Sequence, residues 1–318
     1  MIELIIQHGE QIFEPVLKDN ITIKSSRKGE PSVLNFTLIA DGIVKYEEGD
    51  PVRVRVNGEN AFYGFIFKIS GDKSEERQIT AYDQRRYLKN KGSYNIEKLR
   101  ADQVIKNIAE DVGLQVGTLI NTGYLYSNVE DNVSYFDIIL NAMDETTRNT
   151  EKLYVLYDDM GKLCLDDIGN RKLDILLDSS TGENYEFTSS IDGETYNSVT
   201  LYKDSDSQNN KSINVSDQAN IDKWGLLRYY ASYSDGTDGD TLANALLELY
   251  NQKERTLTLS KQLGDIRVMG GTLVAVSMDL GDTKISSYMM VEEVTHEISE
   301  NYHTMTLNLT GGALTQWV

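Results

Sequence analysis

Residues 49–88 read GDPVRVRVNGENAFYGFIFKISGDKSEERQITAYDQRRYL, and this stretch decides the fold class. Its first half alternates valine with arginine over Pro51–Asn57, which predicts a strand with one apolar face and one charged face. The Asn-Gly pair that follows is typical of a hairpin turn. The next run, 61–70, is apolar on both faces and is expected to be a central strand, and a polar turn leads into a strand at 78–83.

Two further strands are expected before this stretch. Ile21 and Ile23 share one face of a strand at 20–27, and residues 32–40 alternate between apolar and polar. Short strands separated by turns roughly every ten residues are typical of a β-sandwich or β-barrel. Residues 1–94 are therefore expected to form a β domain, and strands in 171–195 are candidates for completing it.

The pattern then changes to helices. Apolar residues recur at helical spacing over 101–113 and over 134–148, where Ser134 is placed to cap the helix. A hairpin is expected to follow at 153–166. Residues 95–170 therefore predict a small α/β module inserted between β-rich regions.

The last third of the chain returns to strands around one helix. Asp240 is expected to be the N-cap of a helix at 241–252. The apolar stripe of this helix is expected to consist of Leu242, Ala245, Leu246, Leu249 and Tyr250. Alternating strands follow the helix, and residues 196–318 are expected to form a second β domain.

The order of strands in the first part recurs in the last part. Each part has an alternating strand, a glycine turn, a Val-x-Val strand, a long strand, a polar turn and another alternating strand. The two Val-x-Val strands begin at Val54 and Val274, and corresponding elements lie about 220 to 227 positions apart. Only order and spacing recur, and an antiparallel meander produces some likeness by chance, so the duplication of a β domain is a hypothesis.

Composition excludes several classes of protein. The chain has 318 residues, with 50 acidic and 31 basic side chains and a net charge of −19. This charge disfavours binding to nucleic acid or to anionic lipid, because both depend on Lys and Arg. No apolar run is long enough for a transmembrane helix, and the start MIELIIQHGEQ lacks the basic region of a signal peptide. We therefore expect synthesis in the cytoplasm and no membrane binding.

Residues that carry chemistry are few and scattered. His296-Glu297 begins like a zinc-protease motif, but no second histidine follows and the segment reads as a strand; the other histidines are His8 and His303. The single cysteine, Cys164, rules out a disulfide framework and is expected to be a packed thiol. No nucleotide-binding loop or nucleophile elbow occurs. The sequence therefore assigns no catalytic, cofactor-binding or metal-binding residue, and no cofactor is expected.

The acidic loop SDGTDGDT offers Asp235, Asp238 and Asp240 as ligands for calcium. A calcium loop starting at Asp235 would need glycine at its sixth position and glutamate at its twelfth, where the sequence has Asp240 and Leu246. We therefore expect this segment to be a loop that leads into the helix.

These segments together resemble a known family. The GD-VxV strand, the Tyr63-Gly64 pair in the long strand and the TAYD…YL ending are similar to the N-terminal domain of baseplate hub proteins. Such hubs occur in contractile phage tails and phage-tail-like bacteriocins. The two helices, the hairpin YVLYDDMGKL (154–163) and the run DKWGLLRYY (222–230) are similar to the Gram-positive branch. The resemblance covers most of the chain, and its specificity comes from the order of short motifs.

The resemblance implies a structural protein without enzymatic activity. Each chain would hold two tail-tube-like antiparallel β-barrel or sandwich domains, and a homotrimer would form a ring of six similar units. The ring would join a sixfold tail tube above to a threefold spike below, beside other baseplate proteins of a virion or tail-like particle made in a bacterial host. DNA would only pass through the lumen. No lysozyme-like or peptidase extension is found, so wall degradation is expected of another polypeptide.

Two other classes stay open. An acidic surface can hold the carboxylate pair of a peptidoglycan- or glycan-hydrolysing enzyme. Exposed rings among the 19 tyrosines would suit a β-rich carbohydrate-binding adhesin.

For a hub, the candidate interfaces are the sheet edges and the helix at 242–250. Sheet edges are candidates because their unpaired backbone groups favour pairing with the next subunit.

Overall fold

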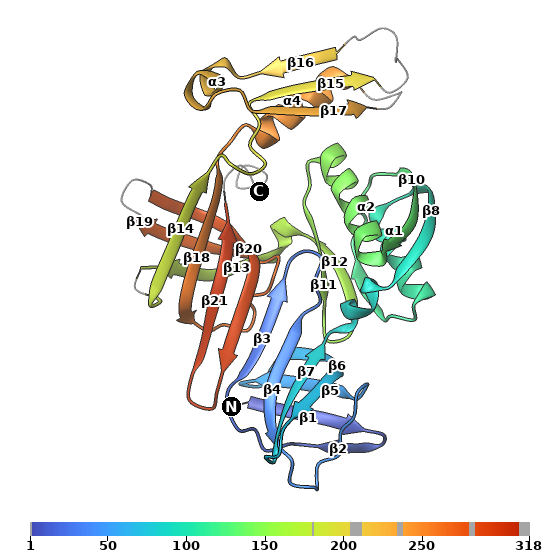
Figure 1. Cartoon of the computed structure of the whole chain (residues 1–318), viewed down its shortest axis with the longest axis vertical. Helices are drawn as coiled ribbons and strands as arrows, with labels where there is room; N and C mark the ends of the chain where they lie inside the picture. Colours follow the sequence, from blue (N-terminus) through green and yellow to red (C-terminus); the bar gives the residue numbers. More distant parts are fainter. Residues whose placement is uncertain (1, 180, 204–211, 234–237, 280–283, 312–318) are drawn as a thin grey trace. The chain divides into compact units, whose positions relative to one another are not determined.

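Strands dominate the computed structural model of the protein, which describes residues 2–179, 181–203, 212–233, 238–279 and 284–311 (Figure 1). The mainly β class with a few helices is therefore confirmed. The described residues divide into two units. Unit 1 consists of Met1–Tyr185 and Thr258–Leu309, and unit 2 consists of Glu186–Leu257 and Thr310–Val318. The three-part division at residues 94, 170 and 195 stays a prediction.

The main feature of the fold is a sheet of thirteen strands, most of which lie in unit 1. These strands are β1 (Ile2–His8), β2 (Gln11–Phe13), β3 (Ile21–Ser26), β4 (Val33–Ile39), β5 (Pro51–Val56), β6 (Glu59–Gly71), β7 (Glu76–Tyr82), β13 (Lys172–Asp178), β14 (Asn184–Ser190), β18 (Glu254–Leu263), β19 (Leu273–Asp279), β20 (Lys284–Ile298) and β21 (His303–Thr310). Their order is β14-β18-β21-β20-β3-β4-β7-β6-β5-β1-β2, and β19 joins β20 and β13.

One pairing order occurs twice in this sheet. β3, β4, β7, β6, β5 and β1 are neighbours in that order, and β14, β18, β21, β20, β19 and β13 follow the same order. One pairing differs in direction between the two sets: β1 is antiparallel to β5, whereas β13 is parallel to β19. They join where β20 pairs antiparallel with β3, placing Val294 opposite Ser25. The recurrence seen in the sequence thus extends to the hydrogen-bonding order.

The N-terminal strands have the faces that the alternation predicts. Val52, Val54 and Val56 are buried, because every second side chain of β5 points into the core. β6 is a central strand, as expected, and pairs with both β5 and β7. Ile298 of β20 is also part of this core, so the end of the chain helps to bury its beginning.

The α/β module packs two helices against short strands. Its elements are η1 (Gln84–Lys89), β8 (Lys91–Leu99), α1 (Ala101–Asp111), β9 (Val116–Leu119), β10 (Tyr126–Ser134), α2 (Tyr135–Thr150), β11 (Tyr154–Asp158), β12 (Leu163–Asp167) and η2 (Ile168–Arg171). β10 pairs with β8, and β12 lies between β11 and β9. Both expected helices and the hairpin are present, and Ser134 caps α2 by accepting a hydrogen bond from the Asp137 amide. None of the described helices is long and apolar enough to span a membrane.

Unit 2 is a small sheet covered by a helix. It contains β15 (Ser198–Lys203), β16 (Ser212–Ser216), α3 (Gln218–Trp224), β17 (Arg228–Tyr233) and α4 (Gly239–Tyr250). The strand order is β16-β15-β17. Its core is formed by Val199 and Leu201 of β15 against Ala243 and Leu246 of α4.

The start of α4 corrects one expectation. Asp238, rather than Asp240, is the N-cap, since its carboxylate accepts hydrogen bonds from the amides of Asp240 and Thr241. Asp240 lies instead in the first turn, where a negative charge interacts favourably with the helix dipole. Ala245 and Leu249 were expected in the apolar stripe but are exposed, because the face that meets the sheet consists of Leu242, Ala243, Leu246, Leu247 and Tyr250.

Candidate functional site

The two C-terminal histidines form a hydrogen-bonded pair. His296 Nε2 lies 2.9 Å from the carbonyl oxygen of Val268, which can only accept, so Nε2 carries the hydrogen. His296 Nδ1 must then accept from His303 Nε2, also at 2.9 Å. Burial lowers the pKa of His296 to about 4, which keeps the ring neutral. Both ring nitrogens of His296 are therefore occupied by hydrogen bonds.

Within the described part of the chain, one group of three side chains has the spacing of metal ligands: His8, Glu47 and Asp50. Asp50 Oδ2 already accepts from His8 Nδ1 at 2.9 Å and from the Glu47 amide at 2.8 Å. The geometry is that of a hydrogen-bonded turn. Sequence spacing did not indicate it, because 42 positions separate His8 from Asp50.

The remaining candidates from the sequence are Cys164 and the acidic loop. Cys164 is buried in β12, and burial raises the pKa of its thiol, so the reactive thiolate is disfavoured. In the acidic loop, Asp238 caps α4, whereas Asp235 lies outside the described residues. The absence of catalytic, cofactor and metal residues stays a prediction.

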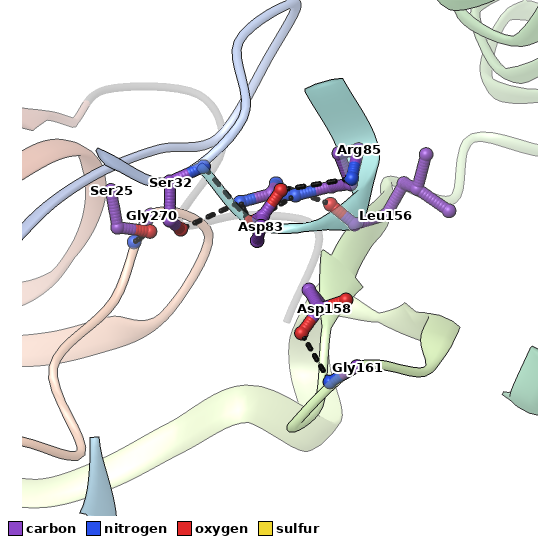
Figure 2. Close-up of polar contacts among 8 residues, drawn as sticks. All are labelled: Ser25, Ser32, Asp83, Arg85, Leu156, Asp158, Gly161 and Gly270. Atoms are coloured by element: carbon purple, nitrogen blue, oxygen red, sulfur yellow. Dashed lines mark hydrogen bonds and ion pairs between the residues drawn. The ribbon is translucent and has the colours of Figure 1, made fainter. Parts of the chain in front are cut away.

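A buried ion pair links the N-terminal strands to the α/β module (Figure 2). Asp83 and Arg85 are both 2% exposed, and the guanidinium donates to Asp83 Oδ2 from Nε at 3.0 Å and from Nη2 at 2.8 Å. Nη2 also donates to Ser32 Oγ at 2.8 Å, and Nη1 donates to the Leu156 carbonyl at 3.3 Å. Arg85 therefore connects the β3–β4 loop with strand β11. We call Ser32, Asp83, Arg85, Leu156 and Asp158 the buried junction.

Asp158 is the second carboxyl group of the buried junction. Its Oδ1 accepts a hydrogen bond of 2.7 Å from the Gly161 amide, whereas Oδ2 is buried and has no hydrogen-bond partner. Burial, followed by the negative charge of Asp83, raises the pKa of Asp158 to about 7. The Gly161 amide and Arg85 act in the opposite direction, and the Gln84 amide does so more weakly. The guanidinium is thus bonded to Asp83 and acts on Asp158 only through its charge.

The same hairpin also meets the C-terminal strands. The Arg171 guanidinium lies 3.8 Å above the Tyr157 ring, and its Nε donates to the Gly271 carbonyl at 3.1 Å. A Cβ on Gly271 would be 2.3 Å from the Val155 side chain, so the hairpin lies close to the loop between β18 and β19. The hairpin therefore contacts strands from both ends of the chain.

A second contact joins the two strand sets directly. The Gly270 amide donates to Ser25 Oγ at 3.1 Å, and both residues lie beside the buried junction in Figure 2. A Cβ on Gly270 would meet the Ser26 carbonyl carbon at 2.4 Å. Only glycine permits this approach of two backbones.

Aromatic rings cover the outer face of β6. Tyr63 and Phe65 meet edge to face at 5.8 Å between ring centroids, and Tyr87 of η1 extends the row at 6.1 Å from Phe65. A cavity of about 390 Å³ lies beside these three rings. Its lining residues are Tyr63, Phe65, Gln84, Tyr87, Val112, Gly113, Leu114, Gln115 and Gly161. No carboxylate pair lines this cavity, so it does not have the chemistry of a glycosidase site.

Three comparisons with known proteins agree with this architecture. The YqbQ-like family model matches residues 21–310. Phage-like element PBSX protein XkdQ of Bacillus subtilis (strain 168) is 27% identical over 322 residues, which cover 97% of each chain. The tail protein of Neisseria meningitidis MC58 has a TM-score of 0.70 at 13% identity, covering 99% of this chain and 98% of that one.

A more distant structure shares the fold as well. The Escherichia coli c3393 protein is described as a type VI secretion component that is structurally similar to the T4 tail proteins gp27 and gp5. Its TM-score is 0.57 at 11% identity, with coverage of 96% of this chain and 76% of that chain. The resemblance to tail and baseplate proteins inferred from the sequence is thereby confirmed. The chain belongs to the YqbQ-like family and has the fold of phage tail proteins.

Proposed function

We propose that this protein is the structural hub of a contractile tail or injection-system baseplate. The observation that carries the proposal is the repeated pairing order, β3-β4-β7-β6-β5-β1 and β14-β18-β21-β20-β19-β13. Each set is proposed to be one tail-tube-like barrel or sandwich domain. Three chains would then present six similar units around a threefold axis, so one ring can match a sixfold tube on one side and a threefold spike on the other.

The proposed partners are two further copies of this chain, the tail tube protein, the spike and other baseplate proteins. XkdQ supports this assignment, because its name places it in a phage-like element. The likeness of c3393 to gp27 supports it at the level of the fold. The proposed role is non-enzymatic, and the proposed location is the baseplate of a virion or tail-like particle.

The first test is the mass and symmetry of the purified protein. Light scattering is expected to give a mass of three times 35.9 kDa. The purified protein is also expected to show no activity on cell walls. Electron-microscopy class averages along the axis are expected to show six similar densities in a ring. A trimer with only three wall densities would contradict the duplicated unit. A monomer that clears peptidoglycan would favour the hydrolase, and a monomer retained on a glycan column would favour the adhesin.

The net charge gives a second expectation. Each copy contributes −19, so a trimer repels polyanions, and DNA in transit is not retained. Duplex DNA is therefore expected to migrate unchanged in a gel-shift assay at low ionic strength, where electrostatic attraction would be strongest. A shifted band that disappears on adding salt would show cationic binding sites and contradict this expectation.

A further inference from the structure

The β11–β12 hairpin holds a carboxyl group whose burial disfavours its ionised form. Asp158 is 8% exposed, and its Oδ2 accepts no well-formed hydrogen bond among the described residues. The nearby Gln84 amide acts on the carboxylate only weakly, because its Nε2 donates to the Gln115 carbonyl at 3.2 Å. An ionised carboxylate in such a position loses its hydration without replacement. A protonated carboxyl group avoids most of this cost.

Arg85 is already paired with Asp83, and four of its five N–H groups donate to groups other than Asp158. All three guanidinium nitrogens already donate: Nε and Nη2 to Asp83, Nη2 also to Ser32, and Nη1 to Leu156. Asp83 is itself a buried carboxylate, so ionisation of Asp158 would place a second negative charge beside one guanidinium. The charged and titratable groups around the hairpin are Asp83 and Arg85 at η1, Tyr157 on β11, Asp159 and Lys162 in the turn, Cys164 and Asp166 on β12, and Arg171 on η2.

The hairpin meets η1 where Arg85 Nη1 donates to the Leu156 carbonyl at 3.3 Å. The turn itself is closed by reciprocal backbone hydrogen bonds between Asp159 and Lys162, at 2.8 and 3.1 Å, so it can move as one piece. Gly161 in this turn packs so closely on the Tyr63 ring that a Cβ would lie 2.7 Å from it. A movement of the hairpin tip away from η1 and β6 would let water reach Asp158 without unfolding the sheet.

We propose that ionisation of Asp158 opens the β11–β12 hairpin from η1 and β6, so that the hairpin is closed at acidic pH and loosened above neutral pH. The sign follows from linkage. In the open state the carboxyl group ionises near its ordinary value of 3.8, and in the closed state it ionises at about 7. The open state is therefore increasingly favoured as pH rises from about 4 to about 7, and the effect levels off above that. The proposal does not depend on the hub role.

The test is hydrogen exchange followed by mass spectrometry on the full chain, with protection corrected for intrinsic exchange rates. Between pH 5.5 and 8, protection of peptides spanning 154–167 is expected to fall about thirtyfold, because the closed state must release one extra proton to open. Between pH 7 and 8, protection of the same peptides is expected to fall less than about twofold. Peptides from unit 2 serve as an internal reference.

Two variants separate Asp158 from other titrating groups. Asp158→Asn keeps an oxygen for the Gly161 amide but cannot ionise, so its protection is expected to be independent of pH over this range. Asp159→Asn removes the neighbouring exposed carboxylate and is expected to behave like the unaltered protein. The His296–His303 pair is present in all three proteins and cancels from the comparison. A flat profile in the unaltered protein, or the same profile in Asp158→Asn, would overturn the proposal.

Discussion

Replacing Arg85 with methionine is expected to lower the free energy of unfolding by about 3–5 kcal/mol, since the substitution leaves the Asp83 carboxylate buried without its cation. Asp83 is 2% exposed, so water does not replace the lost charge. The substitution also removes the donors to Ser32 Oγ and the Leu156 carbonyl. Urea denaturation followed by far-UV circular dichroism measures the effect, because most of the strands belong to unit 1.

Arg148→Met is the matched control for this substitution. Arg148 pairs with Glu145 at 2.9 Å on α2, but both side chains are well exposed. Its loss is expected to change the free energy of unfolding by less than about 1 kcal/mol. The double variant Asp83→Asn/Arg85→Met is expected to be more stable than Arg85→Met, because no unpaired charge stays buried. Equal losses for Arg85→Met and Arg148→Met would show that the buried pair has no special importance.

The second large effect is expected for Gly64→Ala. A Cβ at this position would lie 2.2 Å from the carbonyl oxygen of Tyr82 and 2.7 Å from its carbonyl carbon. Both atoms belong to the backbone of β7, so no side-chain rotation relieves the overlap, and β6 and β7 must separate. We expect a loss of about 3 kcal/mol in the free energy of unfolding, at the upper end for overpacking.

Gly169→Ala controls for the substitution of glycine itself. Its Cβ would meet only the Asp167 Oδ1 atom, at 3.2 Å, and that carboxylate can move. A loss of less than about 1 kcal/mol is expected, measured in the same urea titration. If Gly64→Ala were as stable as Gly169→Ala, the close approach of β6 and β7 would not constrain the fold.

The sequence carried enough local information to place most of the N-terminal strands. The Val-Arg alternation predicted a strand at 51–57, and β5 occupies Pro51–Val56. The Tyr63-Gly64 pair, quoted for the resemblance, now has a physical reason in the contact with Tyr82. By contrast, β8 escaped notice because Ile96 is its single buried residue and supplies no period. α4 begins at Gly239, two residues before the expected start at 241. The expectation was wrong because Asp238 and Asp240 are equally suited by residue type to cap a helix.

The buried junction could not be predicted from the sequence. Asp83 and Arg85 both lie in the stretch that decided the fold class, yet nothing in their spacing indicates burial. Their environment comes from Ser32, 53 positions from Arg85, and from Leu156, 71 positions away. The environment of Asp158 likewise depends on Asp83, although the two helices of the α/β module lie between them in the sequence. Local patterns specify the elements, whereas these charges depend on how distant elements meet.

The pairing of β3 with β20 has a consequence for biosynthesis. Arg27, just after β3, and Glu292, in β20, form an ion pair although 265 residues separate them. A ribosome adds about 5–20 residues per second, so β3 emerges on the order of ten to fifty seconds before its partner. Throughout that interval one side of β3 presents unpaired backbone groups to other nascent chains. The late strand β20 thus covers an edge that is open early in synthesis, and its pairing removes a site for aggregation.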